Sequence, residues 1–281
     1  MFKIIDGKEI SQKVRQRLKQ QVGELTEKGA KPGLAVIIVG NDSASQVYVR
    51  NKQRACEELG IYSEMYAMPE ETTQSELLDV IDVLNESDNI HGILVQLPLP
   101  RTIDENTVIK RILPKKDVDA FSEENVGKIM IGDYSYLPCT PAGIMTLLEE
   151  EGIDVSGKHC VVVGRSNIVG KPMAMLMLHK DATVTICHSK TKNLDEICQS
   201  ADILVAAVGK EKFITKDMVK EGAVVIDVGM NRDKDGKLCG DVDFEGVKEK
   251  TSYITPVPGG VGPMTITTLM QNTITAARKT L

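Results

Sequence analysis

Short apolar runs alternate with amphipathic stretches along most of this 281-residue chain. Runs rich in β-branched residues and bounded by turn residues are typical of buried strands. In the first half, this pattern predicts strands at 34–39, 62–68 and 92–97, with helices at 44–59 and 74–85 between them. In the second half, it predicts strands at 159–163, 183–187, 203–208, 223–228 and 252–255. The alternation predicts an α/β fold with mostly parallel sheets.

The predicted elements form two blocks that a helix at 142–151 joins. A last helix is predicted from residue 264, because five apolar residues recur there at helical spacing: Ile266, Leu269, Met270, Ile274 and Ala277. We expect this helix to pack back onto the first block. The sequence therefore predicts two domains, residues 1–140 together with the closing helix 264–281, and residues 141–263.

Composition narrows the class of protein. With 42% hydrophobic residues, the chain can bury a substantial core. No apolar run approaches the roughly 18 residues of a membrane span, and the N-terminus lacks the order of a signal peptide, so we expect a cytoplasmic protein. The six cysteines are scattered, without a C-x-x-C pair, so neither a disulfide framework nor a metal site is expected. The net charge of -6 argues against a nucleic-acid surface.

The second block opens with a possible phosphate-binding turn. A buried strand leads into a tight turn at Gly164, and a helix opens near Gly170. Such a turn presents backbone N–H groups and a helix N-terminus to a phosphate. Because Arg165 and Ser166 directly follow Gly164, the spacing departs from G-x-G-x-x-G. An ordinary strand-to-helix turn is an equal alternative for this segment taken alone.

The end of the next strand favours one dinucleotide. At this place, about 20 residues past the glycine turn, NAD-binding folds usually carry an acidic residue for the ribose hydroxyl. This chain has His188-Ser189-Lys190 instead. Ser189 and Lys190, with Arg165 on the neighbouring loop, offer donors to a 2'-phosphate, which favours NADP. A solvated loop is the alternative for Lys190.

The most informative local feature lies in the helix at 44–59. Ala44, Tyr48, Ala55 and Leu59 form one apolar stripe, and Lys52 falls in its middle. A buried ammonium is costly unless it serves a site, and burial shifts a lysine toward useful acid/base behaviour. The alternative is a lysine whose stem is buried and whose head reaches water.

Two loops of the chain carry further candidate ligand contacts. Gln96 follows the apolar strand at 92–97, at the end where parallel sheets collect ligands, and Asp117 and Asp119 come soon after. Solvated turn residues are the alternative for both aspartates. The loop 256–263 is rich in proline and glycine, so it permits close backbone approach to a ligand, or else a tight crossing between domains.

Taken together, eight segments in order over more than 200 residues resemble one family. The resemblance is to the bifunctional methylenetetrahydrofolate dehydrogenase/cyclohydrolases. The segments are Tyr48–Lys52, Val95–Leu99, Lys116–Asp119, Pro138–Pro141, Val163–Pro172, Cys187–Thr191, Gly240–Val242 and Thr255–Thr265.

The resemblance implies an N-terminal α/β folate domain and a Rossmann-type NADP-binding domain with a cleft between them, in a homodimer. It implies NADP-dependent oxidation of 5,10-methylenetetrahydrofolate to the methenyl compound. Hydrolysis to 10-formyltetrahydrofolate would follow, within one-carbon metabolism and purine biosynthesis.

The resemblance also implies roles for single residues. Lys52 would be the acid/base group of the hydrolytic step, Tyr48 would tune and position it, Gln96 would orient it, and Asp119 would bind the pterin ring. The cofactor would contact a second set, with Arg165 and Ser189 at its 2'-phosphate: Gly164, Arg165, Ser166, Ile168 and Ser189. The folate would contact a third set: Tyr48, Gln96, Leu97, Asp119, Pro258, Gly259 and Val261.

One departure from the family pattern follows Asp119. The family usually shows glycine, phenylalanine, histidine and proline there, whereas this chain has Ala120-Phe121-Ser122-Glu123. The departure leaves a monofunctional dehydrogenase of the same family as the nearest alternative. A non-catalytic dinucleotide-sensing module is the alternative from another class.

Overall fold

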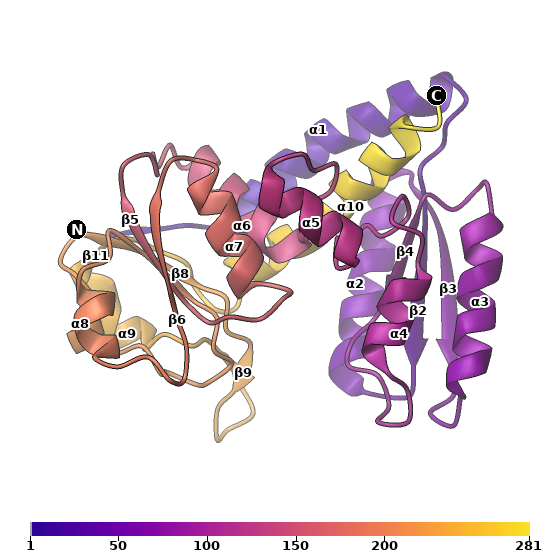
Figure 1. Ribbon diagram of the computed structural model, residues 1–281. Helices are drawn as coiled ribbons and strands as arrows, with labels where there is room; N and C mark the ends of the chain where they lie inside the picture. The colour runs from indigo at the N-terminus through magenta and orange to yellow at the C-terminus, as the bar shows by residue number, and fades with distance from the viewer. Residues whose placement is uncertain (1) are drawn as a thin grey trace. The chain divides into compact units, whose positions relative to one another are not determined.

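The computed structural model describes residues 2–281, except for the side chains of residues 43 and 44. The chain divides into two compact units, of which the first is Met1–Gln12 with Cys139–Thr265 and the second is Lys13–Pro138 with Ile266–Leu281 (Figure 1). None of the helices in residues 2–281 is long and apolar enough to cross a membrane.

The first unit is built on a six-stranded sheet in which every neighbouring pair of strands is parallel. The strand order, with the bounds of each strand, is β1 (Lys3–Ile4), β11 (Thr251–Ile254), β8 (Ala223–Asp227), β7 (Ile203–Ala206), β5 (His159–Val163) and β6 (Thr183–Cys187). Strands β5, β7 and β8 are almost wholly buried, which explains their continuous apolar runs.

Parallel strands need crossover connections, which usually contain a helix. Here α7 (Gly170–Leu178), α8 (Leu194–Gln199) and α9 (Phe244–Val247) lie in such connections, and α6 (Cys139–Glu150) leads into β5. Two single turns of 3-10 helix lie at Lys216–Met218 and Lys248–Lys250. A small antiparallel hairpin, β9 (Asn231–Arg232) with β10 (Leu238–Cys239), follows β8.

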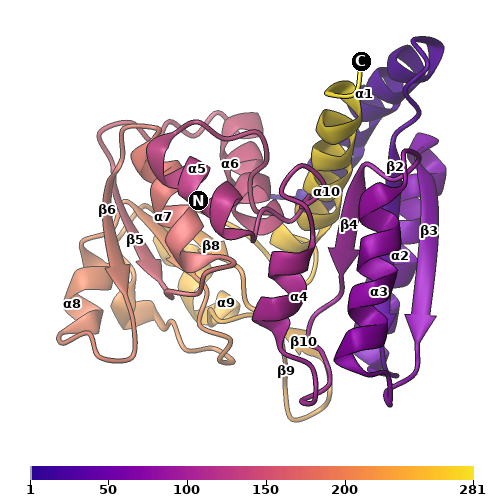
Figure 2. The ribbon, with the colours of Figure 1, turned by 45° about the vertical axis from the view of Figure 1, so that its right-hand side comes forward.

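The second unit contains a three-stranded parallel sheet in the order β3 (Tyr62–Met68), β2 (Gly33–Val39) and β4 (Gly92–Val95). Around it lie α1 (Gly7–Glu27), which begins in the first unit, and five further helices: α2 (Ser43–Leu59), α3 (Gln74–Glu86), α4 (Glu105–Arg111), α5 (Glu123–Ile131) and α10 (Val261–Arg278). Ala35, Ile37 and Val39 pack on α3, and α2 covers the other face of the sheet (Figure 2).

The predicted α/β class with parallel sheets is confirmed. Strands β4 and β7 end two residues earlier than predicted. The sequence analysis did not predict α1, although Ile10, Val14, Leu18, Val22 and Leu25 recur at helical spacing and are all buried.

The first twelve residues lie in the unit that contains Cys139–Thr265, although the sequence analysis assigned them to the other domain. The reason is that β1 pairs in parallel with β11 through Lys3–Tyr253 and Ile4–Ile254. From Ile266 onward, α10 lies in the second unit, where it runs beside α1 (Figure 1). Asn272 of α10 donates hydrogen bonds to the carbonyls of Val118 and Leu137.

Candidate functional site

Helix α2 carries Lys52 on its buried face. Asp42 caps the start of the helix by accepting a hydrogen bond from Ser45 N (2.7 Å), and Gly60 ends it in a left-handed conformation (φ 79°). Val49 and Leu59 are buried on the same face, and Lys52 is only 9% exposed. The predicted position of Lys52 within an apolar stripe is thus observed. The side chain of Ala44, which belonged to the predicted stripe, lies outside the described residues.

Lys52 meets Gln96 at the carboxyl end of β4. Lys52 Nζ donates a hydrogen bond of 2.8 Å to Gln96 Oε1. Gln96 is itself held at both ends: its backbone N–H donates to Ile37 O (2.8 Å), and its Nε2 donates to Leu97 O (2.7 Å). Because Nε2 is already engaged with a carbonyl, the acceptor oxygen of the amide is directed at the lysine.

The other two residues expected beside Lys52 come from the same region of the second unit. Tyr48 is half-buried and precedes Lys52 by one turn of α2. Residues 116–119 run beside β4, since Ile93 N donates to Lys116 O (2.9 Å) and Ile93 bridges Asp117 in parallel. Asp119, two residues after Asp117, therefore lies toward the carboxyl end of β4, the end that leads into Gln96.

Asp117 has a structural task. It is 3% exposed, and its carboxylate accepts hydrogen bonds from Phe121 N (3.2 Å), Ser122 N (2.8 Å) and Asn125 Nδ2 (2.9 Å). These bonds tie the segment after Asp119 to the start of α5. The sequence analysis considered only ligand binding or solvation for Asp117 and missed this role.

The departure after Asp119 has a local structural account. Ala120 adopts a left-handed conformation (φ 58°), which glycine adopts most easily. Ser122 is the N-cap of α5, and its hydroxyl accepts a hydrogen bond from Asn125 N (3.3 Å). Glu123 takes the first helical position, where an acidic residue is favourable. The residues that depart from the family pattern thus form a left-handed turn and a capped helix start.

In the first unit, the turn after β5 is tightly built. Gly164 has a φ of 139°, and a Cβ on it would lie 2.2 Å from Ala207 O. A Cβ on Gly170 would lie 2.3 Å from Gly164 O. Ser166 Oγ accepts hydrogen bonds from Val169 N (3.1 Å) and Gly170 N (3.3 Å), which fixes the start of α7. Only glycine fits at either end of this turn.

This turn leaves donors available to an anion. Within the part of the chain that the structure describes, the backbone N–H groups of residues 165–168 donate no hydrogen bond. The side chains of Arg165, Ser166 and Ile168 are exposed. Successive unsatisfied N–H groups beside a helix start are a common anion-binding arrangement. The turn therefore has groups that fit a dinucleotide phosphate, which is one of the two interpretations that the sequence left open for this segment.

The neighbouring strand end supplies cationic and hydroxyl groups. Gly164 N donates to Cys187 O (2.9 Å), so the turn lies directly beside the end of β6. His188 N donates to Thr191 Oγ1 (2.8 Å), and Lys190 N donates to His188 Nδ1 (3.1 Å), which orders the loop around the exposed Ser189. Arg165 and Lys190 form no ion pair among residues 2–281. No acidic side chain occupies this loop, so the residues fit a 2'-phosphate.

The proline- and glycine-rich loop before α10 packs against the start of α1. Gly260 N donates to Pro256 O (2.9 Å), Gly259 has a φ of 107°, and Pro258 is exposed. A Cβ on Gly7 would lie 1.7 Å from Gly260 O, so Gly7 is required for this contact. The sequence analysis missed Gly7, because nothing in its neighbourhood along the chain indicates a partner more than 250 residues away. Val261, the first residue of α10, is buried.

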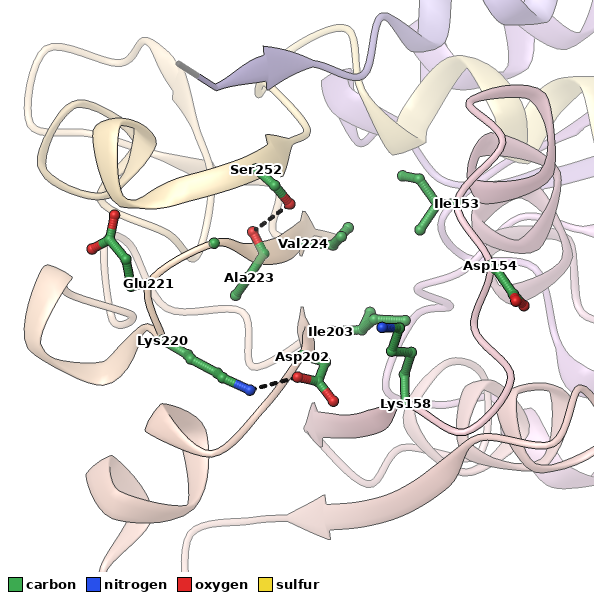
Figure 3. Close-up of a pocket in the computed structure, with 11 residues that line it drawn as sticks. Ile153, Asp154, Lys158, Asp202, Ile203, Lys220, Glu221, Ala223, Val224 and Ser252 are labelled. Carbon is green, nitrogen blue, oxygen red and sulfur yellow. Dashed lines mark hydrogen bonds and ion pairs between the residues drawn. The ribbon is translucent and has the colours of Figure 1, made fainter.

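A separate cavity of about 260 Å³ lies in the first unit, at the end of the six-stranded sheet opposite to the Gly164 turn (Figure 3). Its lining includes Lys158, Asp202 and Gly222, each directly before a strand, and Lys220 pairs with Asp202 at 2.6 Å. Ligands of parallel sheets bind at the carboxyl ends of the strands, whereas this cavity lies at the amino ends. None of the predicted site residues lines it.

Comparison with known proteins agrees with this description. The catalytic domain of tetrahydrofolate dehydrogenase/cyclohydrolase matches residues 5–119, and the NAD(P)-binding domain of the same family matches residues 138–281. The bifunctional protein FolD of Moorella thermoacetica is 61% identical over 98% of this chain and 99% of its own length. That of Acetivibrio thermocellus is 60% identical over 98% of this chain and 97% of its own.

Solved structures give the same result. The bifunctional FolD enzyme of Campylobacter jejuni matches with a TM-score of 0.98 and 50% identity over 100% of both chains. The dehydrogenase-cyclohydrolase of Trypanosoma brucei, solved with NADP and an inhibitor, matches with a TM-score of 0.95 and 38% identity over 99% of this chain and 98% of its own. The resemblance noted in the eight segments is thereby confirmed, and this chain belongs to the tetrahydrofolate dehydrogenase/cyclohydrolase family.

Proposed function

We propose that this protein is a bifunctional enzyme of one-carbon metabolism. It oxidises 5,10-methylenetetrahydrofolate to 5,10-methenyltetrahydrofolate with NADP+, and then hydrolyses the product to 10-formyltetrahydrofolate. The observation that carries the proposal is the hydrogen bond from the buried Lys52 Nζ to Gln96 Oε1 (2.8 Å). Any buried ammonium needs acceptors, as Lys116 has in Leu84 O and Ser87 O. The acceptor of Lys52 is instead a side chain at the carboxyl end of β4, where ligands of parallel sheets bind, and this position supports an acid/base role.

Lys52 acts in the hydrolytic step. Water adds its oxygen to the bridging carbon of the methenyl cation, and the neutral amine of Lys52 accepts one water proton. The bond from this carbon to the pterin-ring nitrogen then breaks, the hydroxyl proton moves to that nitrogen, and the formyl group remains on the other nitrogen. A cationic substrate disfavours a neighbouring ammonium, so it favours the neutral lysine that this step needs.

The neighbours of Lys52 orient it and hold the substrate. Gln96 fixes the direction of Nζ, because the amide is held by its own bond to Leu97 O (2.7 Å). Tyr48, one helical turn away, positions Lys52 and lines the folate site with Leu97. Asp119 grips the amidine edge of the pterin ring with paired hydrogen bonds.

The NADP domain supplies the remaining contacts. Gly164, Ser166 and Ile168 place their backbone around a cofactor phosphate, and Arg165 and Ser189 contact the 2'-phosphate. When bound, NADP+ supplies the hydride acceptor of the first reaction, for which the protein provides chiefly positioning. In the loop that ends at the start of α10, Pro258, Gly259 and Val261 line the folate site. The proposed folate domain is residues 13–140 with 264–281, and the proposed NADP domain is residues 141–263 together with the N-terminal residues whose strand β1 pairs with β11.

We further propose that the protein is a cytoplasmic homodimer and that its product serves purine biosynthesis. The outer strand of the smaller sheet, β3, supports self-association because it has a neighbour on one side only. Within β3, Met65 is 47% exposed and Tyr62 is 40% exposed, and Val47 of α2 is also 47% exposed. An exposed apolar strand edge favours pairing with another chain. Sedimentation equilibrium of the purified protein distinguishes a dimer from a monomer.

The activity is tested on the purified chain with methylenetetrahydrofolate and either NADP+ or NAD+. We expect reduction of NADP+ in preference to NAD+, followed by 10-formyltetrahydrofolate as the final product. Equal rates with both cofactors would refute the roles of Arg165 and Ser189. If the methenyl compound accumulates and is hydrolysed only at its uncatalysed rate, the protein is a monofunctional dehydrogenase. If the protein binds NADP+ but turns over no folate, it is a sensing module.

A further inference from the structure

The first unit contains two buried carboxylates that the proposed mechanism does not use. Asp241 is 0% exposed and Asp227 is 3% exposed. Neither contacts a lysine or arginine side chain in the part of the chain that the structure describes. A buried carboxylate without a cation is costly unless N–H donors surround it. Asp227 is the last residue of β8, and Asp241 bonds to the loop after β7, so both lie at the carboxyl ends of the strands, where ligands of such sheets bind.

Asp241 holds the loop that follows β7. Its carboxylate accepts hydrogen bonds from three consecutive backbone N–H groups, those of Val208 (2.6 Å), Gly209 (3.0 Å) and Lys210 (2.8 Å). A fourth comes from Asn231 Nδ2 (2.8 Å), in the hairpin after β8. Three successive N–H groups on one carboxylate leave the loop little freedom, so Asp241 determines its shape.

Asp227 in turn holds Asp241. Its carboxylate accepts hydrogen bonds from Asp241 N (2.8 Å), Val242 N (2.9 Å) and Gly229 N (2.9 Å). Burial raises the pKa of Asp227 to about 6, although these N–H donors act in the opposite direction. A Cβ on Gly240 would lie 1.8 Å from Asp227 Oδ2, so the Gly240-Asp241-Val242 segment closely encloses this carboxylate. The two aspartates thus form one connected unit, which we call the Asp227–Asp241 clamp.

The clamp reaches the phosphate-binding turn through the loop it holds. Ala207, directly before Val208, donates from its N to Val163 O (2.8 Å). A Cβ on Gly164 would lie 2.2 Å from Ala207 O, so this carbonyl is packed against the turn. A shift of the loop after β7 therefore cannot occur without disturbing Gly164, and the turn depends on the clamp for its position.

We infer that Asp241, held by Asp227, is a positioning residue for NADP binding and hence for the dehydrogenase step. The inference rests on the proposed function. The clamp contacts backbone groups of the two strand-end loops and acts through them. Lys52 and Gln96 belong to the other compact unit. The four bonds of the Asp241 carboxylate go to residues 208–210 and Asn231, outside the proposed folate-lining loop 256–263, so hydrolysis assayed without NADP should stay near the wild-type rate.

The test compares Asp241→Asn with a matched control in the full-length protein. In Asp241→Asn, one oxygen that accepts two N–H groups becomes an NH2 group, which cannot accept them. The control is Asp202→Asn: Asp202 also accepts a backbone bond, from His159 N (2.9 Å), but at the amino edge of the same sheet (Figure 3). NADP+ binding is measured by calorimetric titration. Hydrolysis of methenyltetrahydrofolate is measured without NADP, and folding is followed by thermal unfolding.

Asp241→Asn is expected to raise the Kd for NADP+ about tenfold or more. The kcat and KM of hydrolysis should stay within about twofold of the wild type, and Asp202→Asn should change neither quantity. An unchanged Kd for NADP+ in Asp241→Asn would overturn the inference. So would an equal loss of NADP+ binding and hydrolysis in proportion to a smaller folded fraction. If Asp241→Asn does not fold, the test uses Asn231→Ala, which removes one of the four hydrogen bonds that the Asp241 carboxylate accepts. A Kd raised about threefold with intact hydrolysis supports the clamp, and an unchanged Kd refutes it. Failure of the wild type to bind NADP+ would instead refute the proposed function.

Discussion

Replacing Gln96 by glutamate tests how Lys52 is activated. Gln96→Glu keeps an oxygen acceptor for Lys52 Nζ, which now lies 2.8 Å from the amide oxygen, and adds a negative charge. It also removes the Nε2 donor that holds the side chain to Leu97 O at 2.7 Å. The variant therefore keeps an acceptor for Lys52 Nζ but loses the bond that orients this acceptor, and its charge favours the ammonium form of Lys52.

The size of the effect follows from this distance. An opposite charge within hydrogen-bond reach favours the charged form of a group by the equivalent of about one to three pH units. Because hydrolysis needs neutral Lys52, the rising limb of the pH–rate profile should move to higher pH by about this amount. At neutral pH, the hydrolytic rate should fall about tenfold to a thousandfold and recover as the pH rises.

The matched control is Gln96→Met, which has a similar length but neither charge nor hydrogen-bonding amide. It should lower the rate by about tenfold or more through loss of orientation, without an upward shift of the profile. The assay follows disappearance of methenyltetrahydrofolate from about pH 6 to pH 9, with the uncatalysed rate subtracted. Coincident profiles for the glutamate variant and the wild type would refute the role of neutral Lys52.

Three further predictions concern the scaffold. Ala120→Gly should change the free energy of unfolding by less than about 1 kcal/mol, because relief at the left-handed φ is offset by chain entropy and a lost methyl contact. A shift in the balance of the two activities would contradict the structural account of this segment. Burial lowers the pKa of His91 below 6.5, and its Nδ1 accepts a bond from Gly33 N (3.1 Å). Stability present above pH 6.5 should therefore be lost as the pH falls through the lower folded-state pKa, and His91→Gln should flatten this loss in thermal melts. Equal slopes of Tm against pH for the wild type and His91→Gln would contradict this prediction. Gly164→Ala should destabilise the protein by about 1–3 kcal/mol and weaken NADP+ titration, since its Cβ would strike Ala207 O. An unchanged Kd would contradict the fit of this turn.

Local periodicity predicted much of the fold. The strands β3, β5 and β6 have the predicted bounds, since each is a short run flanked by turn residues. Helix α1 was missed even though five buried apolar residues mark one face. The pairing of β1 with β11 joins segments about 250 positions apart, and two residues carry no periodicity from which to predict it.

The residues of the candidate site show the same difference between local and long-range signals. Lys52 was identified because its neighbours on α2 mark the buried face, which is a local signal. Its bond to Gln96 spans 44 positions, so the roles of the pair came from the family resemblance and not from spacing. Periodicity does not identify Asp227 and Asp241 as buried carboxylates. Asp227 is the one polar residue at the end of an apolar strand, and Asp241 follows a glycine in a loop, where an aspartate is usually solvated. Only the fold surrounds them with N–H donors.

The most direct test of the proposed function is Lys52→Met, assayed beside Lys110→Met. Lys110 is an exposed lysine of the same unit that pairs with Glu123 at 2.7 Å. The Lys52 variant should lose about 100-fold to 10,000-fold of the hydrolytic rate on methenyltetrahydrofolate and keep the wild-type Kd for NADP+. The Lys110 variant should match the wild type in both. Hydrolysis undiminished in Lys52→Met would contradict the central claim that the chemistry of this step runs through Lys52.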